Sequence, residues 1–252
     1  MWPILVHLGP LTLKTYGLMV ALAFLVGGGI LKKGFVARDL APELADRIVW
    51  ISLISAIAGS RILYILSNPV PWTEFFLIWQ GGLSFLGGLL GAFAACLIYL
   101  KKKGVPWLKV ADATALVLPV GHAIGRMGCL AAGCCWGRPA KSFPGITFTN
   151  PECVLPSELL GIRLHPTQLY EAAGLIVIYF IVKKLEWRFP GRLLGIYVLL
   201  YGFLRFSLEF FRADSFVEPG LGPLTFTQAV LLFGLAPPAL AWIFWAKPLR
   251  RA

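Results

Sequence analysis

The chain has 252 residues, of which 58% are hydrophobic and 14% charged, and its mean hydropathy is +0.77. A soluble domain carries about one quarter charged residues, so this composition excludes an ordinary soluble protein and favours a polytopic membrane protein. The formal net charge of +11 does not indicate nucleic-acid binding, because the basic residues lie between apolar runs and not in a separate basic domain. The charge is that expected of cytoplasmic loops, which orient a membrane protein, and anionic lipid headgroups can use the same charge.

Seven apolar runs are long enough to cross a membrane, which takes about 20 mainly apolar residues per helix. In chain order they cover residues 14–31, 48–66, 83–100, 110–128, 168–184, 193–211 and 226–246. The chain shows neither an internal repeat nor a low-complexity linker. We therefore predict an all-α integral membrane protein with seven transmembrane helices in a single domain over residues 1–252.

Basic residues follow the first, third, fifth and seventh runs, and these connections alternate along the chain. By the positive-inside bias they are cytoplasmic, so we expect the N-terminus outside and the C-terminus in the cytoplasm. The longest connection on the opposite, extracytoplasmic side covers residues about 129–167. The basic residues concerned are Lys32, Lys33, Arg38, Arg47, Lys101, Lys102, Lys103, Lys109, Lys183, Lys184, Arg188, Arg192, Lys247, Arg250 and Arg251.

Four cysteines lie in that longest connection, three of them in the stretch GRMGCLAAGCCWGR at residues 125–138. In bacteria the extracytoplasmic face is oxidising, so disulfides are permitted there. Four cysteines allow three complete pairings, and the sequence does not choose among them. A bridge between the neighbours Cys134 and Cys135 would be strained, so pairing with Cys129 or Cys153 is favoured.

Charged side chains also fall inside or at the edges of the apolar runs, where each needs a partner, an aqueous cavity or a function. Arg205 and Glu209 are four residues apart, which places them on one helical face. They form either an internal ion pair or a site where the guanidinium binds a phosphate. His122 lies one turn before Arg126, and it is either a proton acceptor or a helix–helix hydrogen-bond partner. Arg61 could equally extend to the membrane interface.

The chain resembles the prolipoprotein diacylglyceryl transferase family, and the resemblance covers nearly its whole length. The stretches that carry it occur in the family's order: LTLKTYGLMVALAFLVG at 11–27, AGSRILYIL at 58–66, GGLSFLGGLLGAF at 81–93, GRMGCLAAGCCWGR at 125–138, LHPTQLYEA at 164–172 and YGFLRFSLEFFR at 201–212. The resemblance implies transfer of a diacylglyceryl group from phosphatidylglycerol to the cysteine thiol of an exported preprotein, at the outer face of the bacterial inner membrane.

The same resemblance implies the residues of the site. Arg126 and Arg205 match the family's essential arginines, and Glu209 matches the acid of the sixth span. With His122, Cys129, Cys134 and Cys135 these arginines form the expected catalytic set. The expected substrate-binding residues are Tyr16, Arg61, Gly137, Arg138, His165, Gln168, Tyr170, Glu171 and Glu209.

The chain departs from the family pattern at several polar positions. Leu86 stands where the family has a histidine, Cys129 and Ala132 where it has asparagines, and Cys134 where it has glutamate. The thiols therefore occupy positions at which the family keeps catalytic and binding groups.

Three interpretations of the thiols remain open. Cys129, Cys134 or Cys135 acts as a nucleophile, a carrier or an acceptor-site group, since cationic surroundings favour the thiolate, and His122 or His165 replaces the absent histidine as base. Alternatively, Cys134 or Cys135 pairs with Cys129 or Cys153 and rigidifies the loop. A metal site is the weakest interpretation, because the Cys-x4-Cys-Cys spacing lacks a second CxxC pair, and we expect neither metal nor cofactor.

The leading function is diacylglyceryl transfer from phosphatidylglycerol or a related anionic phospholipid. One alternative is a divergent transferase with another acceptor that uses Cys134 or Cys135 as nucleophile. The other is a phospholipid-binding protein without catalytic activity.

Overall fold

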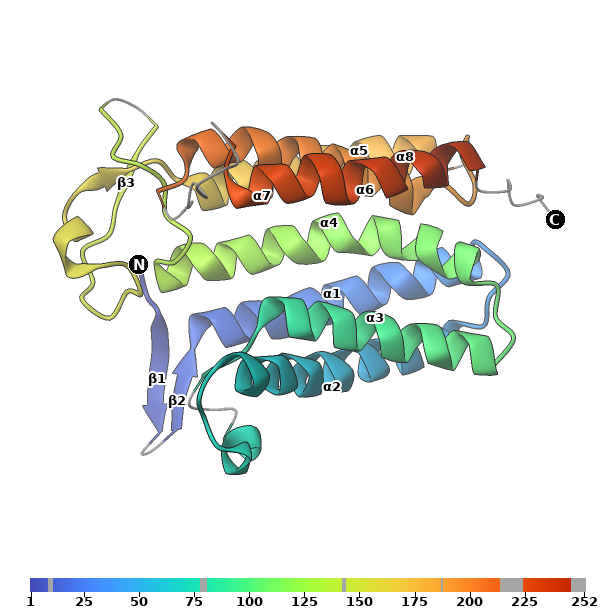
Figure 1. Ribbon diagram of the computed structural model, residues 1–252, viewed down its shortest axis with the longest axis horizontal. Coiled ribbons are helices and arrows are strands. Elements are labelled where there is room, and N and C mark those ends of the chain that lie inside the picture. The colour runs from blue at the N-terminus through green and yellow to red at the C-terminus, as the bar shows by residue number, and fades with distance from the viewer. Residues whose placement is uncertain (9–10, 78–80, 142–143, 187, 214–223, 246–252) are drawn as a thin grey trace. The chain divides into compact units, whose positions relative to one another are not determined.

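The computed structural model describes residues 1–8, 11–77, 81–141, 144–186, 188–213 and 224–245. Long helices dominate it (Figure 1). They are α1 (Thr15–Val36), α2 (Pro42–Ser67), α3 (Phe85–Lys102), α4 (Trp107–Ala132), α5 (Thr167–Leu185), α6 (Leu193–Leu208), α7 (Phe226–Ala229) and α8 (Ala236–Trp245). Short 3-10 turns occupy η1 (Trp72–Phe76), η3 (Ser157–Leu159) and η4 (Glu209–Phe211), and a π-helical segment, η5 (Val230–Leu235), joins α7 to α8.

Six helical segments of the described chain are long and apolar enough to cross a membrane. They coincide with six of the seven predicted runs. The remaining run, 168–184, folds as α5, whose 19 residues include Glu171, Lys183 and Lys184 and do not meet the same criterion. The fold is therefore that of a multi-span helical membrane protein. The end of the last predicted run and the basic residues Lys247, Arg250 and Arg251 lie outside the described residues.

Two small antiparallel sheets are additions that the sequence analysis did not predict. Strands β1 (Ile4–Leu8) and β2 (Leu11–Lys14) pair ahead of α1. Strands β3 (Ile146–Thr147) and β4 (Arg163–Leu164) pair within the long connection between α4 and α5. The second pair brings the end of this connection back to the residues just after α4, because Ala140 donates its amide hydrogen to the Arg163 carbonyl at 2.9 Å.

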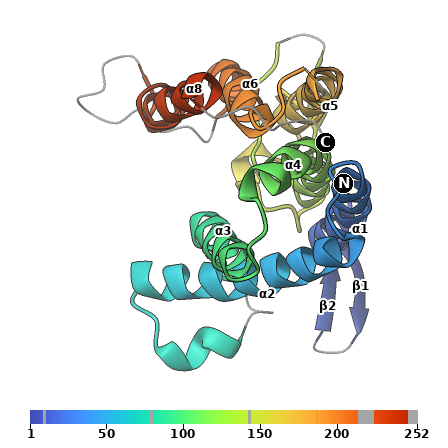
Figure 2. The same ribbon diagram turned by 90° about the vertical axis from the view of Figure 1, so that its right-hand side faces the viewer.

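The chain divides into two compact units. The first contains residues 1–30 and 111–252, and the second contains residues 31–110. In the second unit α2 and α3 lie side by side (Figure 2). Glycines allow this close approach: a Cβ on Gly91 would lie 2.5 Å from the Ser55 carbonyl oxygen, and one on Gly59 would lie 2.5 Å from that of Gly87. Small residues at membrane helix contacts serve this purpose.

The first unit holds a three-helix core of α4, α5 and α6. Its buried side chains are Ala115 and Leu116 from α4, Ile178 and Val182 from α5, and Leu193 and Tyr197 from α6. Helix α6 lies between α5 and α8 in Figure 2. The carboxylate of Asp112, which is 1% exposed, accepts hydrogen bonds from the backbone amides of Gly191 and Leu193 and so attaches the start of α6 to α4. This core sets the positions of the charged side chains at the opposite ends of the same helices.

The outward faces of the helices carry large apolar side chains. Leu25, Phe93, Phe203 and Phe233 are each at least 63% exposed. Such surfaces are rare on a soluble monomer and suit a helix that faces lipid.

Candidate active site at the ends of α4, α5 and α6

Glu171 is a buried carboxylate that joins three helices. Its side chain is 1% exposed, and its Oε1 accepts hydrogen bonds from the Arg126 guanidinium of α4 at 2.8 Å and from the Tyr201 hydroxyl of α6 at 3.0 Å. The His122 Nε2 lies 3.5 Å from the same oxygen, and its ring stands edge-on to Tyr201 with centroids 5.1 Å apart. His122 and Arg126 therefore share one helical face, as their spacing predicted.

A second buried acid pairs with the other predicted arginine. Glu209 is 1% exposed; one oxygen forms an ion pair with Arg205, and the other accepts a hydrogen bond from the Thr225 hydroxyl at 2.9 Å. Thr225 is also the N-cap of α7, where it accepts the Gln228 amide hydrogen at 3.2 Å. The ion-pair alternative for Arg205 and Glu209 is thus the one present in the structure.

Two buried polar atoms near Glu171 have no hydrogen-bond partner among the described residues. They are the Nε of Arg126 and the Oε1 of Gln168. A buried group without a partner is costly, so each of these atoms has unused capacity for a ligand or a water molecule. One terminal nitrogen of the Arg126 guanidinium binds Glu171, whereas its Nε–H has no partner among the described residues. Arg126 can therefore keep its ion pair and still donate a hydrogen bond to an anion.

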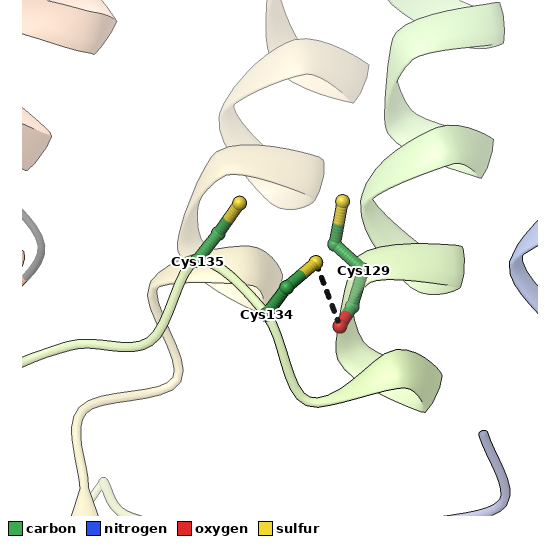
Figure 3. A group of neighbouring side chains, drawn as sticks. All are labelled: Cys129, Cys134 and Cys135. Atoms are coloured by element: carbon green, nitrogen blue, oxygen red, sulfur yellow. Dashed lines mark hydrogen bonds between the residues drawn. The ribbon is translucent and has the colours of Figure 1, made fainter. Parts of the chain in front are cut away.

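The three thiols of the GRMGCLAAGCCWGR stretch lie together. The sulfur atoms of Cys129, Cys134 and Cys135 are all within 4.8 Å of one another. Figure 3 shows Cys129 on the last turn of α4, with Cys134 and Cys135 on the chain that turns back from it. The Cys134 amide donates to the Cys129 carbonyl at 3.1 Å, and its thiol lies 3.7 Å from the same oxygen. All five cysteines of the chain are free thiols, and Cys153 is separate from this group, in an apolar cluster with Phe148.

The first residues of α5 fix the backbone of this thiol turn. The Thr167 hydroxyl donates to the Cys135 carbonyl at 2.7 Å, and the Gln168 amide nitrogen donates to the Cys134 carbonyl at 2.7 Å. Both side chains are 1% exposed. Gly133 has a φ of 71° and Cys135 a φ of 60°, a left-handed conformation that glycine adopts readily and cysteine rarely. The turn is therefore held in a defined and partly strained shape.

The thiols in the turn differ in acidity. The pKa of Cys135 is lowered because its sulfur accepts hydrogen bonds from Cys129 and Cys134, and because Arg126 and Arg212 add positive charge, although burial acts in the opposite direction. The pKa of Cys134 is raised by its hydrogen bonds to Cys129 and Cys135 and by burial. Of these two thiols, Cys135 is therefore the more acidic.

The chain after the thiol turn reaches the end of α6. Gly137 pairs with Arg212 in an isolated bridge, and a Cβ on Gly137 would lie 2.5 Å from the His165 carbonyl oxygen. The Arg138 Nε donates to the Arg212 carbonyl at 3.1 Å. The His165 Nδ1 lies 3.1 Å from the Tyr170 hydroxyl oxygen. These contacts place the expected binding residues of both motifs in one unit with Glu171.

Tyr16 also belongs to this unit. Its ring packs on α4, where a Cβ on Gly128, the residue before Cys129, would lie 3.2 Å from the Tyr16 ring. Arg61 and Leu86 belong to the other compact unit. There the guanidinium of Arg61, which is 2% exposed, donates to the backbone carbonyls of Phe75, Leu77, Gly81 and Gly82 at 2.6–3.3 Å. A substrate-binding role for Arg61 stays a prediction.

Sequence reasoning missed several residues that position the charged groups. Tyr201 lies four residues before Arg205 on the same helical face, a spacing from which its place could have been inferred. Thr167 was part of a quoted motif but had no expected role. Arg212 ends a quoted motif but likewise had no expected role. Thr225 gave no signal in the sequence, because its contact with Glu209 depends on the folding of a distant segment.

The fold and the site define a class: a multi-span membrane protein in which buried arginine–carboxylate pairs from three helices lie beside a polar, thiol-bearing turn. A model of the family described as prolipoprotein diacylglyceryl transferase matches residues 3–244. The chain belongs to this family, whose members are transferases.

Named relatives agree with the family match. The chain is 33% identical to the phosphatidylglycerol–prolipoprotein diacylglyceryl transferase of Nostoc sp. over 263 residues, which cover 97% of this chain and 90% of that protein. It is 33% identical to the protein of that name from Cupriavidus metallidurans over 85% of this chain and 82% of the relative. The corresponding protein from Rhodospirillum rubrum is 33% identical over 83% of this chain and 79% of the relative.

Proposed function

We propose that this protein transfers a diacylglyceryl group from phosphatidylglycerol, or a related anionic phospholipid, to an acceptor at the outer face of the bacterial inner membrane. The leading acceptor is a cysteine thiol of an exported preprotein. The family match and the names of the relatives support the transfer itself. The proposal on the acceptor rests on those names alone.

We also propose a seven-span topology with the N-terminus outside, in one membrane domain over residues 1–252. Here α5 is added to the six spans as the fifth in chain order. The extracytoplasmic connection predicted over residues about 129–167 is the segment 133–166 between α4 and α5. Two observations support this arrangement. Helix α5 shares the buried core of α4 and α6, and Lys33, Lys101, Lys102, Lys183 and Lys184 lie in the last turns of α1, α3 and α5.

The observation that carries the functional proposal is the pairing of two span-borne arginines with buried acids in one compact unit. Arg126 of α4 pairs with Glu171, and Arg205 of α6 pairs with Glu209. An arginine inside an apolar span is expensive, and its planar fork matches a phosphate. In the proposed complex the two guanidiniums bind the phosphate of the donor lipid and stabilise its charge as it leaves.

The reaction replaces one C–O bond by a C–S bond, at the carbon of the diacylglyceryl group that is esterified to the phosphate. The acceptor thiol loses its proton, because the thiolate is the nucleophile. Its sulfur forms a C–S bond as the C–O bond breaks, and the electron pair leaves with the glycerol phosphate. His122 is the proposed proton acceptor, since it stands beside Arg126 and 3.5 Å from the Glu171 carboxylate.

The other proposed site residues position the arginines or contact the substrates. Glu171 and Glu209 position the two arginines. The three neighbouring thiols of Cys129, Cys134 and Cys135 are proposed to lie where the acceptor thiol binds. Within the same compact unit, the proposed contacts to substrate come from Tyr16, Gly137, Arg138, His165, Gln168 and Tyr170. Arg61, in the other unit, is proposed as a substrate-binding residue from the family resemblance alone.

Complementation tests the proposal. The chain is expressed in a bacterium depleted of its own diacylglyceryl transferase, and the mass of a reporter lipoprotein is measured. We expect a diacylglyceryl mass increase that falls at least about a hundredfold in rate in Arg126→Lys and Arg205→Lys, which keep the charge but lose the fork. Arg188→Gln, at an exposed arginine, is the matched control and retains activity. A folded protein that gives no mass increase rules out preprotein lipidation.

Leu86, Cys129 and Cys134 favour a second candidate, because polar family residues are absent at these positions. In this alternative the chain binds anionic phospholipid without turning it over. Retained lipid binding by the purified protein, together with no transfer to any thiol, would select it.

A further inference from the structure

The half-buried thiols of Cys129, Cys134 and Cys135 form a close group, because their side chains extend to the same side of the turn (Figure 3) and their sulfurs lie within 4.8 Å of one another. We propose that it is a binding site for a divalent metal ion of the zinc class. Three thiolates hold the ion, and its fourth coordination position stays open. The spacing in the sequence argued against a metal, whereas the fold brings the three ligands to one point.

The separation of the sulfurs suits a metal better than a disulfide. A zinc–sulfur bond is about 2.3 Å long, which in a tetrahedral site places the sulfurs about 3.8 Å apart. The three sulfurs lie within 4.8 Å of one another, so binding requires shifts on the order of 0.5 Å. A disulfide would join two of them at about 2.05 Å and leave the third unused.

The polypeptide around the sulfurs is arranged before any ion binds. Thr167 and Gln168 of α5 fix the carbonyls of Cys135 and Cys134, as outer-shell partners do in metal sites. Cys135 has a left-handed backbone conformation, and such strain is concentrated at active sites and ligand clamps. The hydrogen bonds from α5 therefore keep the turn in a conformation in which the three sulfurs lie close together.

Ligand count and charge select the class of ion. Within the part of the chain that the structure describes, the group contains three cysteines and no fourth cysteine, histidine or acid. Zinc sites with three protein ligands and an open position are typical of catalytic zinc. Three thiolates and one divalent ion carry a net charge of −1. Arg126 lies one helical turn before Cys129 on α4, and Arg212 pairs with Gly137 two residues after Cys135, so both place positive charge beside the turn.

One consequence rests on the proposed function. An acceptor thiol that binds the open position would release its proton to His122, the proposed proton acceptor, because a coordinated thiol is deprotonated. Its sulfur would then be ready to form the C–S bond, as described above. Such a site would supply the deprotonation that the family assigns to polar residues, in a chain with Leu86, Cys129 and Cys134 at their positions.

The experiment measures metal binding by the purified full-length protein, reduced and stripped of metal. Zn²⁺ is titrated against a chromogenic competitor, and Cd²⁺ reports sulfur coordination through its ultraviolet charge-transfer band. We expect one ion per chain and an affinity at least about tenfold lower in Cys129→Ser, Cys134→Ser and Cys135→Ser. The controls Cys96→Ser and Cys153→Ser, at thiols outside the group, bind like the parent protein.

Two results would overturn the proposal. One is that the parent protein binds Zn²⁺ no more tightly than the Cys129→Ser/Cys134→Ser/Cys135→Ser triple variant does. The other is a disulfide between two of these cysteines that forms in the native membrane and excludes metal.

Metal binding is measured without turnover, so it separates the two proposals. A chain that binds Zn²⁺ but transfers no lipid retains the metal site and loses the proposed function. If the triple variant transfers lipid at the full rate, the metal has no part in the reaction, and the proposed transfer function still holds.

Discussion

Arg126 and Glu171 form a buried ion pair between α4 and α5, with 2.8 Å between the Arg126 guanidinium nitrogen and the Glu171 Oε1. The two residues are 45 positions apart in the chain. The pair neutralises a guanidinium within a membrane-spanning helix and sets its position relative to His122 and Tyr201, which face the same carboxylate oxygen. Under the proposed function, a change at this pair would therefore affect both stability and activity.

Removal of the Glu171 charge should destabilise the protein strongly. In Glu171→Gln the buried Arg126 loses its anionic partner, and breaking a buried pair from one side costs about 3–5 kcal/mol. We expect a lower melting temperature in detergent. Glu158→Gln, at an exposed acid, is the control. The double variant Arg126→Gln/Glu171→Gln should recover part of the loss, and equal melting of Glu171→Gln and the control would show that the pair contributes nothing.

Tyr201→Phe should lower the free energy of unfolding by about 0.5–1.5 kcal/mol, because it removes the hydrogen bond from the Tyr201 hydroxyl to Glu171 at 3.0 Å. Tyr99→Phe provides a matched comparison. The Tyr99 hydroxyl is buried and has no hydrogen-bond partner among the described residues, so its loss should be neutral or stabilising. Chemical unfolding of both variants measures the difference. A larger loss from Tyr99→Phe would contradict this assignment of partners.

The Thr167 hydroxyl should control access to the thiol turn. Thr167→Val removes the hydrogen bond to the Cys135 carbonyl while keeping the shape of the side chain. In a background of Cys96→Ser and Cys153→Ser, we expect faster alkylation of Cys134 and Cys135 by a maleimide. Thr147→Val, at an exposed position of β3, is the control. Unchanged rates would mean that the turn is fixed by other contacts.

The sequence was a good guide to the helices, because their apolar composition depends on local residues alone. Predicted runs such as 110–128 and 193–211 match α4 and the α6–η4 segment closely. Residues 168–184 did fold as a helix, but the charged residues Glu171, Lys183 and Lys184 keep α5 from meeting the composition criterion for a span. That criterion does not register that Glu171 is buried and bound to Arg126.

The geometry of the site was less accessible to sequence reasoning. Spacing alone placed His122 with Arg126 and Arg205 with Glu209, since these pairs are one helical turn apart. The contact of Glu171 with Arg126, and the hydrogen bonds from Thr167 and Gln168 that fix the turn holding Cys134 and Cys135, arise from packing between segments that are not adjacent in the chain. No local pattern encodes these contacts.

The α2–α3 contact should depend on the absence of side chains at its glycines. In Gly91→Ala the new Cβ would lie 2.5 Å from the Ser55 carbonyl oxygen, so the helices must separate, at a cost of about 1–3 kcal/mol. Gly29→Ala is the matched control, because a Cβ at this helical position in α1 meets nothing within 4 Å. Alanine there should stabilise the helix by about 0.5–1 kcal/mol. Thermal unfolding in detergent should therefore shift in opposite directions for the two variants. A common direction would show that close backbone approach does not determine the stability of this helix pair.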